Sequence, residues 1–178
     1  MPPRKHNARD TSFVDGEIAL GDFELSPWRD SDRHDFARLL EIESDIVGQM
    51  ALDYYDSPEK LLTAFSRWED SWTANHWGPY AIRRGAELVG FAGPHPVPGH
   101  PYPIWSGALA ARYRRQGLGS AAVEAIGRRL QLSGSRTFAK ASNAAVNAAL
   151  IKAGWIQENR ERYGDADVIW YRRDDWLN

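Results

Sequence analysis

A short glycine-rich segment between an expected strand and an expected helix constrains this chain more than any other part of its sequence. Residues 109–120 have the sequence Leu-Ala-Ala-Arg-Tyr-Arg-Arg-Gln-Gly-Leu-Gly-Ser. Glycines let the backbone turn tightly and expose consecutive N–H groups, and the helix that follows adds the positive end of its dipole. Arg114 and Arg115 can add charge-assisted hydrogen bonds at the rim. The segment therefore predicts a site for a pyrophosphate.

The rest of the chain alternates between strand and helix periods. Before the glycine segment, we expect a strand at 23–25, a helix that begins at Asp30 or Ser31, a helix that begins at 57–58, a hairpin of 80–82 with 88–91, and a strand at 104–109. After it, we expect helices at 120–132 and 144–153 and strands at 137–139, 155–156 and 168–171. This order is typical of an α/β domain, here in its α+β form.

Length and composition limit the class of protein. The 178 residues suffice for one domain with a sizeable core. Residues 1–21 mix prolines, charges and turn formers, so we expect a flexible N-terminal tail before a single domain at 22–178. The absence of cysteine excludes disulfides, thiolate metal sites and a cysteine nucleophile. A net charge of -2 argues against a nucleic-acid partner.

The sequence gives no sign of a membrane or secretory segment. No apolar run approaches the roughly 20 residues that span a bilayer, and the N-terminus lacks the apolar stretch of a secretory signal. We therefore expect a cytoplasmic protein without a membrane partner.

Two motifs together resemble the GNAT superfamily of N-acetyltransferases. Arg114, Gly117 and Gly119 match its signature of Arg or Gln, two residues, Gly, any residue, and Gly or Ala. Asn143, an alanine-rich helix and the segment 152–155 (Lys-Ala-Gly-Trp) resemble the family's second motif. The resemblance covers about 23–176. Its character is that of the ribosomal-protein N-terminal (RimJ/RimL-like) acetyltransferase branch.

The resemblance implies a fold, a co-substrate and a reaction. The fold would be a mixed, mostly antiparallel sheet flanked by helices and splayed between the strands that contain Ile104 and Phe138. The co-substrate would be acetyl-CoA, without a metal, and a primary amine would attack its thioester directly. The residues implied to bind the cofactor are Ala108, Leu109 and Ala111 along the pantetheine arm, Arg114, Arg115, Gln116, Gly117, Leu118, Gly119 and Ser120 around the pyrophosphate, and Asn143. Asn143 fits equally well as a helix cap.

The sequence departs from the family at its usual catalytic positions. Leu150 stands where many members have a tyrosine as general acid, and the stretch 104–108 has no acid where many have a glutamate as general base. The catalytic residues are therefore unknown, with His100, His95 and Ser142 as weak candidates. A surface histidine, a helix-flanking serine or a chain of ordered waters explains the same pattern equally well.

The two early helices, which would face the acceptor in this family, are rich in acidic residues. These are Glu41, Glu43, Asp45, Asp53, Asp56, Glu59, Glu69 and Asp70, against Lys60 and Arg67. They predict a cationic amine, either a small molecule or a peptide, although a solvated helical face would have the same composition. Homodimers are common in the branch that the sequence resembles, so the resemblance also implies a possible homodimer.

Two other functions are compatible with parts of the sequence. A CoA-binding regulatory or catalytically degenerate GNAT domain would keep the fold without the missing acid and base. A dinucleotide-binding oxidoreductase would explain 117–122, which also fits Gly-x-Gly-x-x-Gly/Ala. That fingerprint expects an acid about 20 residues later, where this chain has Phe138-Ala139-Lys140.

Overall fold

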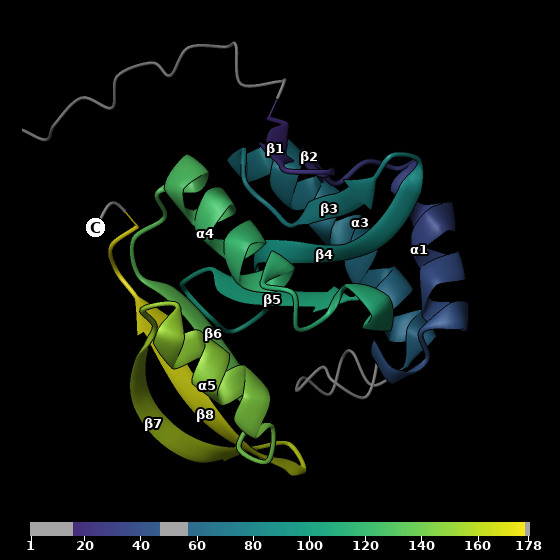
Figure 1. Ribbon diagram of the computed structural model, residues 1–178. Coiled ribbons are helices and arrows are strands. Elements are labelled where there is room, and N and C mark those ends of the chain that lie inside the picture. Colours follow the sequence, from purple (N-terminus) through teal and green to yellow (C-terminus); the bar gives the residue numbers. More distant parts are fainter. Residues whose placement is uncertain (1–15, 47–56, 177–178) are drawn as a thin grey trace, which may run out of the picture.

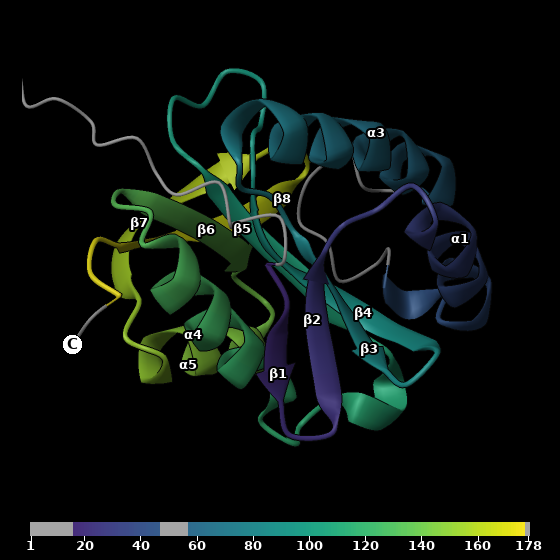
Figure 2. The same ribbon diagram turned by 90° about the horizontal axis from the view of Figure 1, so that it is seen from above.

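The computed structural model describes residues 16–46 and 57–176, which form one eight-stranded sheet with helices on both faces (Figure 1). The strands are β1 (Ile18–Leu20), β2 (Phe23–Pro27), β3 (Tyr80–Arg84), β4 (Glu87–His95), β5 (Ile104–Leu109), β6 (Ser135–Lys140), β7 (Ile156–Tyr163) and β8 (Ala166–Arg173). The helices are α1 (Asp32–Ile42), α3 (Pro58–Asn75), α4 (Leu118–Leu130) and α5 (Ala144–Lys152), with a 3-10 turn, η3, at Ala111–Tyr113. Figure 2 shows α1 and α3 on one face of the sheet and α4 and α5 on the other.

Local sequence signals account for the boundaries of α3 and α5. Ser57 caps α3 by accepting a hydrogen bond from the Lys60 N–H, and Pro58 occupies the first helical turn. Asn143 caps α5 by accepting from the Val146 N–H, and Gly154, with φ of 83°, follows its C-terminal end. These caps confirm the predicted starts of both helices.

An aromatic core lies between the α1–α3 layer and the sheet. It contains Trp28, Phe36, Phe65, Trp68 and Phe91, all nearly or fully buried. The ring centroids of Trp28 and Phe65 are 4.5 Å apart, and those of Trp68 and Phe91 are 4.9 Å apart. Such pairs add to the free energy gained from burial alone. The core therefore packs α1 and α3 against β4.

The sheet consists of two antiparallel halves joined at one parallel junction. The strand order is β1-β2-β3-β4-β5-β6-β8-β7, and every neighbouring pair except β5–β6 is antiparallel. β5 and β6 pair only at Ile104 with Arg136 and at Trp105 with Thr137. Beyond these residues the strands separate. The structure thus confirms the predicted mixed, mostly antiparallel sheet, and the fork lies at the predicted pair of strands.

Residues near the C-terminus connect α4 to the second half of the sheet. The Trp176 ring is almost fully buried and lies where a Cβ on Gly127 of α4 would be, 1.8 Å from the nearest ring atom. Arg173 Nη1 donates to the Ala153 carbonyl oxygen at 2.7 Å and lies 2.8 Å from Glu124 of α4. The fork is thus supported from the α4–α5 side by side chains rather than by strand pairing.

The structure differs from the sequence prediction in three places. β1 lies inside the expected tail, because three residues pair with β2 and thereby extend the domain; residues 1–15 lie outside the described part. α4 begins at Leu118 rather than at 120, because the left-handed Gly117 serves as its N-cap. β7 is much longer than expected from its polar, exposed sequence, because main-chain pairing with β8 forms it.

Candidate active site

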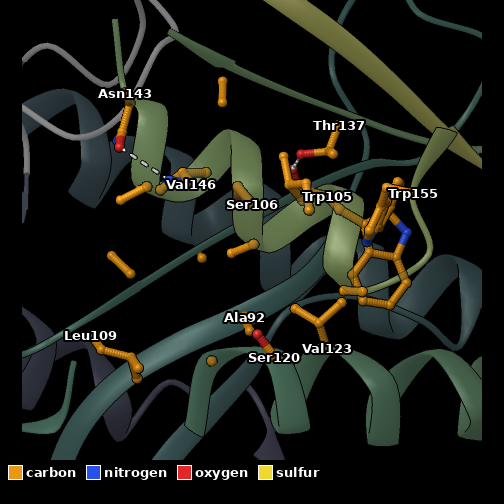
Figure 3. Close-up of a pocket in the computed structure, with 18 of the residues that line it drawn as sticks. Ala92, Trp105, Ser106, Leu109, Ser120, Val123, Thr137, Asn143, Val146 and Trp155 are labelled. Atoms are coloured by element: carbon orange, nitrogen blue, oxygen red, sulfur yellow. Dashed lines mark hydrogen bonds between the residues drawn. The ribbon is translucent and has the colours of Figure 1, made fainter. Parts of the chain in front are cut away.

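A cavity of about 680 Å³ occupies the fork between β5 and β6 (Figure 3). Leu109 lies at the left of the view and Trp155 at the right, with Ser120 and Trp105 between them. Successive side chains of a strand point to opposite faces of the sheet. Because consecutive β5 residues from Ile104 to Leu109 all line the cavity, it passes through the fork from the α4–α5 face to the α1–α3 face.

One end of the cavity is built by the N-terminus of α4. Gly117 is the N-cap, has φ of 83° and offers no side chain to cap the helix. The first intrahelical bond runs from the Ala121 N–H to the Gly117 carbonyl at 3.0 Å, so the N–H groups of residues 118–120 precede the helical ladder. A Cβ on Gly119 would meet only Leu109 Cδ1, at 3.6 Å. The backbone here is open to a ligand, and the helix dipole favours an anion.

The charged side chains that line this cavity are all cationic among the described residues. Arg114, Arg115 and Lys140 belong to its lining. In the part of the chain that the structure describes, no carboxylate belongs to it. Arg115 is exposed and has φ of 61°, a conformation that a non-glycine residue adopts only when its surroundings impose it. The charge of the lining therefore suits a polyanionic ligand.

The guanidinium of Arg114 is held by protein groups. Its Nε donates to the Leu109 carbonyl at 2.6 Å, and its two terminal nitrogens contact Asp45, the longer hydrogen bond measuring 3.1 Å. Glu43 lies 3.7 Å from the same group and accepts a 3.0 Å hydrogen bond from the Ala111 N–H. The Asp45 carboxylate raises the pKa of Arg114. Arg114 thus ties the glycine segment to the end of α1.

The structure brings most of the predicted cofactor-binding residues to one cavity. Those that line it are Ala108, Leu109, Arg114, Arg115, Gly117, Gly119, Ser120 and Asn143. Three others do not belong to the lining. Ala111 is exposed and its N–H binds Glu43, Gln116 donates from Nε2 to the Arg112 carbonyl at 2.6 Å, and the Leu118 side chain is buried in the core.

The second motif supplies the opposite wall. Asn143 lines the cavity and its side-chain oxygen caps α5, which confirms the cap interpretation. The cap uses the oxygen, so the amide nitrogen can make other contacts. Leu150, at the position of the family's tyrosine, also lines the cavity. The neighbouring Asn147 is structural: it donates to the Lys140 carbonyl and accepts a 2.9 Å hydrogen bond from the Tyr171 hydroxyl.

The three weak catalytic candidates all lie outside the lining of the cavity. His95 is fully buried, with its ring 6.0 Å from that of Trp68, and burial lowers the pKa of its imidazole to about 4. His100 packs on the Trp170 ring at 5.6 Å, and its Nδ1 lies 3.4 Å from the Tyr102 hydroxyl. Ser142 is exposed and lines a smaller hollow beside Arg160 and Asp167.

The acidic residues of the early helices have varied surroundings. Glu43 and Asp45 are engaged by Arg114, whereas Glu41, Glu59 and Asp70 are exposed. Asp53 and Asp56 lie outside the described residues. The exposed carboxylates place negative charge on the surface of the α1–α3 layer.

Sequence reasoning missed several residues of the inner end of the cavity. These are Trp105, Ser106, Val123, Thr137 and Trp155. Trp155 occurs in the second motif and in the expected strand at 155–156, and the others occur in ordinary strand or helix patterns. They differ from other strand and helix residues only in lying beside the end of the β5–β6 pairing. The sequence alone does not give that position.

A family model for the acetyltransferase (GNAT) domain matches residues 22–156. The chain belongs to the GNAT acetyltransferase family. This match confirms the resemblance found in the sequence and identifies the chain as an acetyl-CoA-dependent acetyltransferase. It also decides against the dinucleotide interpretation of 117–122. Curated proteins provide no match to the sequence.

Solved structures of other GNAT acetyltransferases have the same fold. A GnaT-family acetyltransferase from Bordetella pertussis is 16% identical with a TM-score of 0.74, over 88% of this chain and 98% of that chain. Ribosomal-protein-S5-alanine acetyltransferase from Vibrio fischeri is 13% identical with a TM-score of 0.70, over 91% and 99%. RimL, a ribosomal L7/L12 α-N-protein acetyltransferase in complex with coenzyme A, is 18% identical with a TM-score of 0.72, over 89% and 97%. At these identities the likeness establishes the fold.

Proposed function

We propose that this GNAT enzyme transfers the acetyl group of acetyl-CoA to a primary amine inside the fork between β5 and β6. One observation carries the proposal: a single cavity runs from the N-terminus of α4, where the N-cap Gly117 has no side chain, to the opposite face of the sheet, and Arg114, Arg115 and Lys140 belong to its lining. Acetyl-CoA has the matching layout, because its anionic phosphates and its reactive thioester lie at opposite ends of a flexible arm. The arm would then pass through the sheet.

The residues around α4 fit the phosphates. The N–H groups of residues 118–120 and the dipole of α4 would receive the pyrophosphate, and Arg115 would add a charge-assisted hydrogen bond. Ser120 lies beside them in the lining. Arg114 would act by holding the segment in place through Leu109, Glu43 and Asp45.

The edge of β5 fits the arm and the thioester. β6 leaves this edge after Trp105, so main-chain groups of residues 106–109 on that side have no strand partner in β6. They can pair with the amides of the pantetheine arm and donate to the thioester oxygen as it gains charge. The amine would approach from the α1–α3 face, attack the carbonyl carbon and displace the CoA thiolate. Holding both reactants in line can lower the activation free energy by about 7 to 11 kcal/mol in favourable cases.

The acceptor is a primary amine on a small molecule or a peptide, and the exposed carboxylates of α1 and α3 favour a cationic one. The names of solved neighbours support a protein α-amino group as one candidate, since they include ribosomal-protein N-terminal acetyltransferases. No helix among the described residues has the length and apolar character needed to cross a membrane. The expected cytoplasmic location and homodimer stay predictions.

A charge placed at Gly119 tests the proposed phosphate site. The space around Gly119 accepts a side chain, so Gly119→Glu should fold normally while its carboxylate repels the phosphates. Acetyl-CoA binding, measured by calorimetry, should weaken by at least about 100-fold. Ala121→Glu is the matched control, because it adds the same charge two residues later on an exposed position outside the cavity lining. Unchanged affinity in the Gly119 variant would contradict the proposed site.

A further inference from the structure

Ser106 occupies the point where the fork begins. The β5–β6 pairing ends at Trp105 with Thr137, and Ser106 is the next residue of β5. Its register partner on β4 is Gly93, which has no side chain to cover it. Ser106 belongs to the lining of the cavity and is labelled in Figure 3. A ligand that follows the free edge of β5 inward therefore ends beside Ser106.

The side chain of Ser106 faces the layer formed by α1 and α3. Trp105 packs against Trp155 and Trp176 on the α4–α5 side, with ring centroids 6.2 and 4.7 Å away. Because side chains alternate along a strand, Ser106 points to the other face. Ala108 has the same orientation as Ser106, and its register partner on β4 is Phe91. The Phe91 ring lies 4.9 Å from that of Trp68 of α3, which confirms that these side chains face the α1–α3 layer. This is the face from which the amine would approach.

The hydroxyl of Ser106 is buried and has no hydrogen-bond partner among the described residues. Other buried hydroxyls nearby are satisfied: Thr137 donates to the Trp105 carbonyl at 2.8 Å, and Ser135 donates to the Leu132 carbonyl at 2.8 Å. Buried polar groups without a partner are rare in folded proteins and require an explanation, such as a catalytic role. The surroundings of Ser106 in the cavity include the apolar side chains of Ala108 and Phe138.

We propose that Ser106 is a catalytic residue that relays a proton from the attacking amine to the leaving sulfur, an inference that rests on the proposed function. A neutral amine forms the C–N bond, and the carbonyl π electrons move to oxygen. In the tetrahedral intermediate the nitrogen carries a proton that it must lose. Ser106 Oγ accepts that proton and gives its own to sulfur as the C–S bond breaks. The products are the amide and the free CoA thiol, and Ser106 ends neutral.

A serine suits this role because one hydroxyl both donates and accepts a hydrogen bond. The relay needs neither a carboxylate on β5 nor a phenol at Leu150, the two positions where this chain departs from its family. It requires only that the hydroxyl lie between the nitrogen and the sulfur. The proposed path of the arm would bring the sulfur to the end of the fork, beside Ser106, and the amine would arrive on the face that Ser106 points to.

The test compares Ser106→Ala with Ser106→Thr and with Ser66→Ala, an exposed serine on α3. Thiol release from acetyl-CoA is measured with an alanine-terminated peptide and with spermidine, and acetyl-CoA binding is measured by calorimetry. We expect Ser106→Ala to lower kcat by about 100-fold while the Kd for acetyl-CoA stays unchanged. Ser106→Thr, which keeps a hydroxyl, should recover most of the rate, and Ser66→Ala should match the wild type.

The outcomes separate the two proposals. A wild-type enzyme that binds acetyl-CoA and releases no thiol with either amine would overturn the proposed function and the relay with it. A wild-type enzyme that turns over, together with a Ser106→Ala variant of nearly unchanged kcat, would overturn the relay alone. A Kd that rises in parallel with the loss of rate would also overturn it, because Ser106 would then serve binding.

Discussion

His95 should make the folded protein less stable when the pH is lowered from 7.5 to 5. The imidazole is fully buried, and burial lowers its pKa in the folded protein from 6.5 to about 4. In the unfolded chain the imidazole regains its ordinary pKa. Between these two values the unfolded state binds a proton that the folded state does not bind, so acid favours unfolding. The stabilisation is present above pH 6.5 and is lost as the pH falls toward 4.

The size of the effect follows from the two pKa values. At pH 5 the imidazole of the unfolded chain is almost fully protonated, whereas that of the folded protein is mostly neutral. The difference in proton binding, integrated from pH 7.5 to pH 5, corresponds to about 2 kcal/mol. The full loss, about 3 kcal/mol, is reached only below pH 4. Either value is a large part of the free energy of unfolding of a domain this size.

Urea denaturation of the wild type and of His95→Gln at both pH values provides the assay. Glutamine does not titrate, and every other ionisable group is common to the two proteins. The free energy of unfolding lost between pH 7.5 and pH 5 should therefore be about 2 kcal/mol smaller in the variant. The variant itself should be less stable at pH 7.5, because His95 packs beside Trp68. Equal losses in both proteins would refute the reasoning.

Two further substitutions test the packing and the charge of the site. Gly127→Ala should lower the free energy of unfolding by about 2 kcal/mol, because its Cβ would lie 1.8 Å from the Trp176 ring. Gly119→Ala is the control in the same helix, because its Cβ would make only a 3.6 Å contact. Equal urea midpoints for the two variants would contradict this explanation. Arg115→Gln should weaken acetyl-CoA binding by about tenfold in calorimetry, and the loss should shrink at high salt. Arg128→Gln is the control, because Arg128 is on the last turn of α4 and outside the cavity lining, and it should bind acetyl-CoA like the wild type. Equal affinities of the two variants for acetyl-CoA would exclude a role for Arg115.

The parts of the fold that could be predicted from the sequence are those that local chemistry decides. The strand at 104–109 matches β5 residue for residue, and the predicted 80–82 and 88–91 hairpin lies within β3 and β4. Asn143 and Gly154 mark the two ends of α5 because a cap depends on a few neighbouring residues. β7 could not be predicted in full, because Gln157 to Arg162 are polar and exposed and only main-chain pairing with β8 makes them a strand.

The candidate site divides in the same way. Its proposed phosphate end lies in one continuous segment, so Arg114, Gly117 and Gly119 could be proposed from the sequence motif. Its inner end depends on contacts between distant segments. Glu43 accepts a hydrogen bond from the Ala111 N–H, 68 positions away, and Ser106 has a buried hydroxyl without a partner among the described residues. Both features depend on how the strands and helices pack. No local pattern in the sequence carries that information.

The connection between α4 and the residues at 173–176 has a consequence for the order in which the protein is made. The N-terminal half of the sheet and its aromatic core leave the ribosome first, and domains acquire structure as they emerge. Until Arg173 and Trp176 follow, Glu124 lacks its buried cation and Trp105 lacks its stacking partner. A growing chain therefore carries an unfinished cavity wall with exposed tryptophans and an unpaired strand edge. Both invite aggregation until residues 173–176 have joined the fold.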